Sequence, residues 1–168
     1  MKTIQYIKGD AAVPNTEGNK IIAHICNDIG GWGKGFVTAV SKRWKHPEKE
    51  YREWFRSKEN FTLGEIQMVR TEEDVWVCNM IAQHKIITHS EVPPIRYMAA
   101  EECLLKLTHE ALQRNASVHM PRIGCGLAGG KWEQIDEKFK PENLNIDFDT
   151  VYGSYSPYSQ DFKKFSNA

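Results

Sequence analysis

Two glycine-rich segments stand out among the polar residues of this sequence, and each follows a run rich in apolar residues. Residues 27–35 read Asn-Asp-Ile-Gly-Gly-Trp-Gly-Lys-Gly, and residues 124–130 read Gly-Cys-Gly-Leu-Ala-Gly-Gly. Glycine permits positive φ angles and lets backbone N–H groups approach a ligand closely. A helix that begins directly after such a loop adds partial positive charge, which suits a phosphate or diphosphate. Together the two loops predict a nucleotide-like ligand, although either loop alone could be only a tight strand-to-helix turn.

The segments around these loops alternate between strand-like and helix-like patterns. Strands are expected at 3–8, 20–26, 64–70, 74–82, 117–123 and 146–152, and helices at 36–44, 47–58, 95–114 and 132–140. The runs at 20–26 and 117–123 are typical of strands buried on both faces. The order predicts a three-layer α/β/α sandwich with a mixed, mostly parallel central sheet of about six strands. Both glycine loops then lie at the carboxyl ends of strands, where such sheets bind ligands.

The composition indicates one folded domain. Hydrophobic residues make up 40% of the 168 residues, which is enough for a packed core and excludes disorder as the main state. Lys plus Arg and Asp plus Glu are 22 each, so there is no bulk basic excess of the kind that nucleic-acid or membrane binders carry. No apolar run approaches the ~18 residues of a membrane helix. We expect a domain at 1–153, a loose C-terminal tail at 154–168, and a monomeric, cytoplasmic protein without a membrane partner.

Several familiar sites are excluded by spacing. The stretch Gly33-Lys34-Gly35-Phe36 lacks the spacing and the hydroxyl of a P-loop. The Gly-x-Gly-x-x-Gly pattern at 124–129 fails as a dinucleotide fingerprint because the acidic residues at 147 and 149 begin the next strand, at the opposite sheet edge. No Cys-x-x-Cys pair accompanies the histidines, so no metal site is expected, and Cys26, Cys78, Cys103 and Cys125 are expected as reduced thiols in or near the core. There is also no Gly-x-Ser-x-Gly motif for Ser-His-Asp catalysis.

Taken together, the motifs resemble those of a macrodomain over about residues 4–152. The residues that carry the resemblance are Gly9-Asp10, 24–28 (His-Ile-Cys-Asn-Asp), the loop 30–36, 77–84 (Val-Cys-Asn-Met-Ile-Ala-Gln-His) and 117–127. They are most similar to the branch that contains the macrodomain of a poly(ADP-ribose)-sensing chromatin remodeller and the terminal ADP-ribose protein glycohydrolase. We expect a bacterial stand-alone member.

The resemblance implies that ADP-ribose lies across the carboxyl ends of the sheet, with no cofactor. Asp10 would accept a hydrogen bond from the adenine amino group, Tyr152 at the end of the last strand would flank the adenine, and Asn27 would contact the distal ribose. Backbone N–H groups of both glycine loops would hold the diphosphate. The expected ADP-ribose-binding residues are Asp10, Ala11, Asn27, Gly33, Lys34, Gly35, Phe36, Gln83, Gly124, Cys125, Gly126, Leu127 and Tyr152.

The sequence departs from the glycohydrolase at two places that matter for chemistry. That relative has a lysine nucleophile near the end of the fourth strand and an aspartate in the second glycine loop; here Gln83 or His84, and Ala128, stand there, with Lys85 adjacent. We therefore expect a hydrolase without the usual lysine, in which water attacks the anomeric carbon through an oxocarbenium-like transition state. The expected catalytic residues are Asn27, Asp28 and His84.

Three functions remain open at this stage. An ester leaving group needs less acid assistance than an amine, which favours removal of mono-ADP-ribose from Glu and Asp side chains of proteins. A non-catalytic reader of ADP-ribose or poly(ADP-ribose) is the second. The third is hydrolysis of ADP-ribose 1″-phosphate, O-acetyl-ADP-ribose or ADP-ribosylated DNA. Each polar residue also has a structural alternative, because Asp and Asn favour turns through their own side chains and His84 could be an ordinary surface histidine.

Overall fold

The computed structural model describes residues 6–86, 92–124, 128–131, 133–134 and 151–155. They form a six-stranded sheet in the order β1-β6-β5-β2-β4-β3. The strands are β1 (Tyr6–Lys8), β2 (Asn19–Asn27), β3 (Ile66–Glu72), β4 (Val75–Gln83), β5 (Ala116–Met120) and β6 (Val151–Tyr155). The helices are α1 (Phe36–Arg43), α2 (His46–Ser57) and α3 (Tyr97–Arg114). Neighbouring strands are parallel except β3 and β4, so the predicted mixed, mostly parallel sheet is confirmed.

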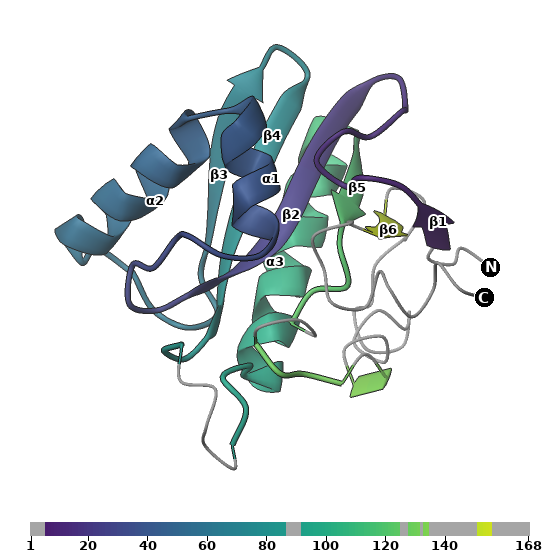
Figure 1. Ribbon diagram of the computed structural model, residues 1–168. Coiled ribbons are helices and arrows are strands. Elements are labelled where there is room, and N and C mark those ends of the chain that lie inside the picture. The colour runs from purple at the N-terminus through teal and green to yellow at the C-terminus, as the bar shows by residue number, and fades with distance from the viewer. Residues whose placement is uncertain (1–5, 87–91, 125–127, 132, 135–150, 156–168) are drawn as a thin grey trace.

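Helices cover both faces of this sheet, which confirms the three layers (Figure 1). Successive side chains of β2 point to opposite faces. Ile21 and Ala23 belong to the core under α3, whereas Ile22 packs with Val40 and Trp44 on the face that α1 covers. The central strands β2 and β4 are therefore buried on both faces, as their apolar runs predict.

Two strands end three residues away from the predicted position, whereas the other strand ends that the structure describes differ from the prediction by at most two residues. The strand expected at 117–123 ends at Met120, because Pro121 has no N–H to donate to the ladder. The last strand was expected to end at Tyr152, but β6 continues to Tyr155. Parallel pairing of β1 with residues 153–155 extends it, an interaction that local sequence does not reveal. Residues 146–150 and 156–168, and most of the predicted helix 132–140, lie outside the described residues.

A buried chain of polar side chains ties α2 to the sheet. The His24 ring, 2% exposed, bonds through Nε2 to Asn79 Oδ1 at 2.6 Å. The Asn79 amide donates to the carbonyl of Pro47 and to Gln67 Oε1, and Gln67 in turn donates to the carbonyl of Glu50. Each buried polar group in this chain has a partner, which offsets the cost of burial.

Burial lowers the pKa of His24 from 6.5 to about 4. As the pH falls, the unfolded chain therefore takes up this proton before the folded chain does. The contribution to stability is complete above pH 6.5 and is lost between 6.5 and 4, at about 1.4 kcal/mol per pH unit. Urea unfolding of wild type and His24→Gln at pH 7 and pH 4.5 measures it. The variant should lose about 2 kcal/mol less between the two pH values than wild type does; equal losses would contradict the assignment.

Cys26, Cys78 and Cys103 are buried free thiols, as the spacing predicts, and burial raises the pKa of Cys103 to about 12. Cys125 lies outside the described residues. Among the described residues there is no group of three or more His, Cys, Asp or Glu side chains arranged for a metal ion. None of the helices described is both long and apolar enough to cross a membrane.

Candidate functional site

The first glycine loop joins β2 to α1 and leaves a run of backbone N–H groups open. Gly35 precedes the helix with φ 85° and ψ −145°, a conformation that glycine alone adopts readily. Its carbonyl is turned back to accept from the N–H and the hydroxyl of Thr38. In the described part of the chain, the N–H groups of residues 33–37 have no hydrogen-bond acceptor. This arrangement can bind an anionic group at the start of α1.

Two aromatic side chains at this loop pack against the body of the domain. Trp32 and Phe36 pack against the core on the α1 face, and both rings lie near the His24 ring, with centroid distances of 5.3 and 5.8 Å. Gly30 has φ 74°, and a β-carbon there would overlap the ring of Phe55. Packing thus holds the two aromatic rings, and the backbone of residues 33–35 stays accessible. Lys34 is exposed and has no ion-pair partner within the described residues, so its expected contact with a phosphate stays a prediction.

Asp28 and His84 form a pair at the carboxyl ends of β2 and β4. A register shift between Cys26 and Asn27 sets Asn27 beside Gln83, so that the next residues of each strand face one another. His84 Nδ1 lies 2.6 Å from Asp28 Oδ2, and the backbone N–H of Lys85 donates to Asp28 Oδ1 at 2.8 Å. The Asp28 side chain is 18% exposed and that of His84 41%. A carboxylate and an imidazole, both accessible, are thereby locked together.

The hydrogen bonds of Asp28 determine which nitrogen of neutral His84 carries the proton. One carboxylate oxygen of Asp28 accepts from the Lys85 N–H and the other faces His84 Nδ1, and an ionised carboxylate only accepts hydrogen bonds. The proton of neutral His84 therefore lies on Nδ1, which leaves the Nε2 lone pair to accept a proton. Such a pair can act as a general base toward a water molecule.

The Asn27 side chain bonds mainly to the loop that follows it. Its amide oxygen accepts from the N–H groups of Ile29 and Gly31 and from the Tyr51 hydroxyl, and its amide nitrogen donates to the Gly31 carbonyl. One amide hydrogen is left for the expected contact with a ribose. Gln83 likewise donates to the carbonyl of Lys85, which stabilises a turn where Lys85 has φ 58°. Both side chains thus hold the residues around the Asp28–His84 pair.

Asp10 lies in a turn after β1. Asp10 Oδ1 accepts from the N–H of Ala12 at 2.9 Å, while Oδ2 has no partner among the described residues. Ala11 is buried, and the Ala12 carbonyl accepts from Arg43, which ties the turn to α1. One oxygen therefore forms the turn that sequence reasoning allows as an alternative, and the other stays free for a ligand donor.

Substitution of Asp10 can separate the turn made by Oδ1 from the ligand contact expected of Oδ2. In Asp10→Asn the amide oxygen can keep the turn, but the NH2 group replaces the free acceptor and would face the adenine amino group. We expect Asp10→Asn to unfold at nearly the wild-type temperature and to bind ADP-ribose about tenfold more weakly, as does Asp10→Ala. Calorimetric titration measures both variants; wild-type affinity in Asp10→Asn would remove Asp10 from the adenine contact.

The second glycine loop is described only at its ends. Gly124 has φ 74°, and its carbonyl accepts from the Gly130 N–H at 2.7 Å, which closes the loop. The expected diphosphate contacts Cys125, Gly126 and Leu127 lie outside the described residues. The continuation of β6 corrects the position expected for Tyr152: it pairs with His119 inside the sheet, while Tyr155 pairs with Lys8 at the end nearer to Asp10.

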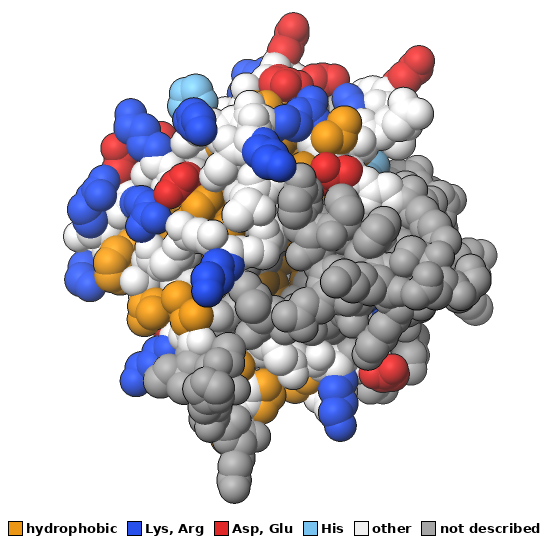
Figure 2. Space-filling view, viewed as in Figure 1, with side chains coloured by type: hydrophobic (Ala, Val, Ile, Leu, Met, Phe, Trp, Pro, Cys, Tyr) orange, Lys and Arg blue, Asp and Glu red, His pale blue; other side chains and the backbone are white. Residues whose placement is uncertain are grey.

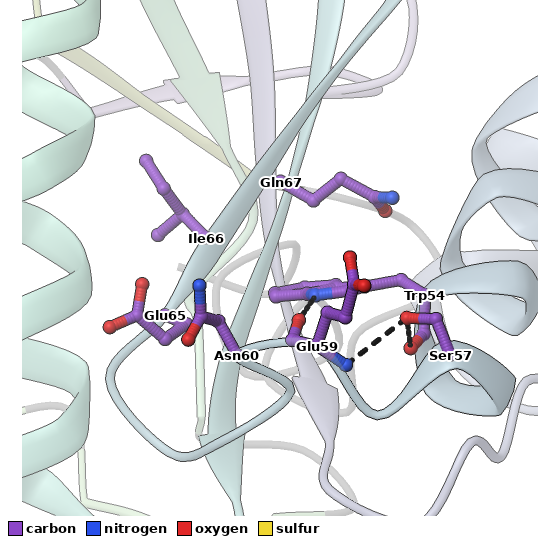
Figure 3. Close-up of a pocket in the computed structure, with 7 residues that line it drawn as sticks. All are labelled: Trp54, Ser57, Glu59, Asn60, Glu65, Ile66 and Gln67. Carbon is purple, nitrogen blue, oxygen red and sulfur yellow. Dashed lines mark hydrogen bonds between the residues drawn. The ribbon is translucent and has the colours of Figure 1, made fainter.

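A pocket of about 350 Å³ lies away from all these residues, between the end of α2 and the start of β3 (Figure 3). Its lining residues are Trp54, Ser57, Glu59, Asn60, Glu65, Ile66 and Gln67. Several of their polar groups are already paired: Trp54 Nε1 with the Glu59 carbonyl, and Glu65 with Lys106. None of the predicted site residues lines it, and no arrangement of its side chains indicates a ligand.

Solved structures share this fold. A protein of unknown function from Bacteroides thetaiotaomicron is 52% identical, with a TM-score of 0.85, over 92% of this chain and 98% of that one. A macrodomain protein from Streptomyces coelicolor is 44% identical, with a TM-score of 0.78, over 90% of this chain and 97% of that one. The Thermosipho africanus DarTG protein, solved with ADP-ribose, shares the fold at 16% identity and a TM-score of 0.64, over 83% of this chain and 39% of that one.

Named proteins are also similar to this chain in sequence. Chromodomain-helicase-DNA-binding protein 1-like from Mus musculus is 32% identical over 139 residues, which are 77% of this chain but 15% of that protein. The ADP-ribose 1″-phosphate phosphatase of Candida albicans is 25% identical over 153 residues, 85% of this chain and 96% of the phosphatase. No family model matches the chain.

The fold is an α/β domain in which open backbone N–H groups lie at the carboxyl edge of the sheet, where such folds can hold a phosphorylated ligand. The likeness to the Streptomyces macrodomain over nearly the full length of both chains then gives the family: this chain belongs to the macrodomains. The resemblance stated from the sequence motifs is thereby confirmed.

Proposed function

We propose that this macrodomain binds ADP-ribose and hydrolyses the ester that joins mono-ADP-ribose to Glu and Asp side chains of proteins. The observation that carries the proposal is the Asp28–His84 pair, 2.6 Å apart, at the same sheet edge as the open amides of residues 33–37. A phosphate-holding loop beside an accessible carboxylate and imidazole offers both binding and base catalysis.

Three features support ADP-ribose as the ligand. The relatives include ADP-ribose 1″-phosphate phosphatases that match over most of their length, and one protein of the same fold was solved with ADP-ribose. The free Oδ2 of Asp10 offers an acceptor for an adenine amino group. The N–H groups of residues 33–37 offer donors for a diphosphate.

The chemistry follows from the orientation of the pair. A water molecule gives a proton to Nε2 of His84 as its oxygen attacks C1″ of the distal ribose. The bond between C1″ and the ester oxygen breaks, and its electron pair leaves with the carboxylate of the Glu or Asp side chain. Asp28 stabilises the imidazolium that forms. The products are free ADP-ribose and a carboxylate, and His84 returns its proton to solvent.

A lysine nucleophile is not needed in this scheme. The part of Lys85 in contact with the pair is its backbone N–H, which donates to Asp28. Lys85 has φ 58°, a conformation that glycine adopts more readily than lysine does. In Lys85→Gly the N–H contact remains possible, so ADP-ribose release should stay close to the wild-type rate. A large loss in this variant would favour a mechanism that uses the lysine side chain.

Hydrolysis of ADP-ribose 1″-phosphate is the second candidate function. The observation that favours it is the match to fungal phosphatases named for that substrate, which covers 80–90% of this chain at 22–25% identity. The same Asp28–His84 pair would then face a phosphate ester on C1″ rather than a carboxylate ester.

One experiment separates these functions. The protein is incubated with a glutamate-linked mono-ADP-ribosylated protein, with ADP-ribosylated DNA and with ADP-ribose 1″-phosphate, and mass spectrometry follows free ADP-ribose. We expect release from the protein substrate, fast in wild type and Lys85→Gly. Release of ADP-ribose from ADP-ribose 1″-phosphate alone, or from ADP-ribosylated DNA alone, would mean that this compound and not the modified protein is the substrate. Retention of the protein substrate in a pull-down, without release, would make the chain a reader.

A further inference from the structure

Helix α2 contacts the first glycine loop, residues 27–35, through Arg52. The Arg52 guanidinium donates from Nη1 to the carbonyl of Gly30 and from Nη2 to the carbonyl of Trp32, each at 3.1 Å. Its Nε donates to Glu48 Oε1 at 3.0 Å, one helical turn back. The planar guanidinium thus bonds in three directions at once, to two loop carbonyls and to an acidic side chain on its own helix.

This contact orients an amide that the proposed function uses. In a trans peptide the C=O and the next N–H point to opposite sides of the chain. Because the Trp32 carbonyl is turned toward Arg52, the N–H of Gly33 in the same peptide is turned away from α2. Gly33 is one of the predicted diphosphate donors, and its N–H has no acceptor in the described segments.

A second set of bonds holds the same loop from α1. Trp32 Nε1 donates to Ser41 Oγ at 2.8 Å, and the Ser41 hydroxyl donates to Glu48 Oε2 at 3.4 Å. Glu48 therefore receives bonds from both Arg52 and Ser41, so that the two helices and the loop are joined at one carboxylate. Such a closed network fixes geometry better than a single contact.

We propose that Arg52, oriented by Glu48, is a positioning residue that presents the Gly33 N–H to the diphosphate. The inference rests on the proposed function for the identity of the ligand, but the orientation of the Gly33 amide can be measured without any ligand.

The competing explanation is general attraction between a positive surface and a phosphate. Lys and Arg side chains gather on the side of the molecule where α2 lies (Figure 2), and Lys45, Lys49, Arg56 and Lys58 are exposed there. Arg56 lies one turn beyond Arg52, in the last turn of α2. Arg56→Gln therefore removes the same charge from the same helix and serves as the matched control. Arg52→Lys keeps the charge and loses the two-carbonyl geometry.

The test is calorimetric titration with ADP-ribose, together with NMR of the Gly33 amide in the ligand-free proteins. Arg52→Gln and Arg52→Lys should both bind about tenfold more weakly than wild type, and Arg56→Gln should bind within about twofold. In hydrolysis assays the loss should appear as a higher KM with kcat nearly unchanged. The Gly33 N–H resonance of the ligand-free protein should shift in both Arg52 variants and stay unchanged in Arg56→Gln.

Each contrary result has a distinct meaning. Wild-type affinity in Arg52→Lys with weak binding in Arg52→Gln would show that charge acts rather than geometry, and would overturn the proposal. An unchanged Gly33 resonance in both variants would overturn it as well. Absence of ADP-ribose binding by wild type would refute the proposed function, and the Gly33 resonance would still decide the role of Arg52.

A double-mutant cycle with Glu48 checks the network. Glu48→Gln should weaken ADP-ribose binding by less than Arg52→Gln does, because the amide oxygen can still accept one bond. The double variant should be no weaker than Arg52→Gln alone, since both changes act through the same guanidinium. Additive losses would mean that the two residues act separately.

Discussion

Asp28→Asn should release ADP-ribose from the glutamate-linked substrate about 100-fold or more slowly than wild type, with nearly unchanged affinity for ADP-ribose. The N–H of Lys85 needs an acceptor, so the asparagine oxygen should take the place of Oδ1. Its NH2 group then faces His84 Nδ1 and donates to it. The imidazole proton moves to Nε2, and the nitrogen that should accept a proton from water no longer can. Single-turnover kinetics with the modified protein measure the rate.

The double variant Asp28→Asn with His84→Gln supplies the control. If the two side chains act as a unit, the double variant should be about as slow as the slower single variant. Thermal unfolding of each protein reports whether the fold is kept. Full turnover in Asp28→Asn would remove Asp28 from catalysis and leave the pair a structural contact between two strand ends.

Gly35→Glu should weaken ADP-ribose binding by about 100-fold, the largest loss of affinity expected from one change in the loop. The new carboxylate would lie next to the open N–H groups and repel a diphosphate. The residue at this position also has φ 85°, which disfavours any side chain, so stability should fall by about 1–2 kcal/mol. Calorimetry gives the affinity and urea unfolding the stability.

Gly35→Ala separates the two causes. Alanine shares the backbone strain but brings no charge, so it should lose similar stability and much less affinity than Gly35→Glu. Equal losses of affinity in both variants would mean that the conformation of the loop, and not repulsion by the new carboxylate, causes the loss.

The arrangement of elements followed largely from sequence because hydrophobic burial sets it. The continuous apolar run of β2 requires helices on both faces, and the structure has α1 on one and α3 on the other. The sequence also predicts that Asp28 and His84 lie near each other, because each follows a buried strand and the carboxyl ends of parallel strands meet at one sheet edge. The register shift that sets them side by side depends on the packing of two strands and has no local signal.

The bonds of Asn27 to its own loop are one of the alternatives that its residue type allows, whereas the contact of Arg52 with that loop has no signal in the sequence. Asn27 looks like a ligand contact from its position, yet Tyr51 on α2 and the loop amides occupy its oxygen. Arg52 with Glu48 has the spacing of an ordinary surface ion pair on a helix. The fold also brings Arg52 against the carbonyls of Gly30 and Trp32, some 20 residues earlier, and that contact cannot be read from the helix alone. The extension of β6 past Tyr152 likewise arises from pairing with β1.

The place of β6 in the sheet has a consequence for the order in which the molecule folds. β6 lies between β1 and β5, and β1 has no other strand neighbour in the described sheet. The first strand therefore cannot be seated until a segment nearly 150 residues later along the chain has docked, a contact whose loop-closure cost delays it. The unit β2-β4-β3 with its helices can form earlier, since its pairings are closer in sequence. On this view the Asp28–His84 pair is assembled before β1 is seated, so a partly folded molecule would bring these two strand ends together before it adds its first strand to the sheet.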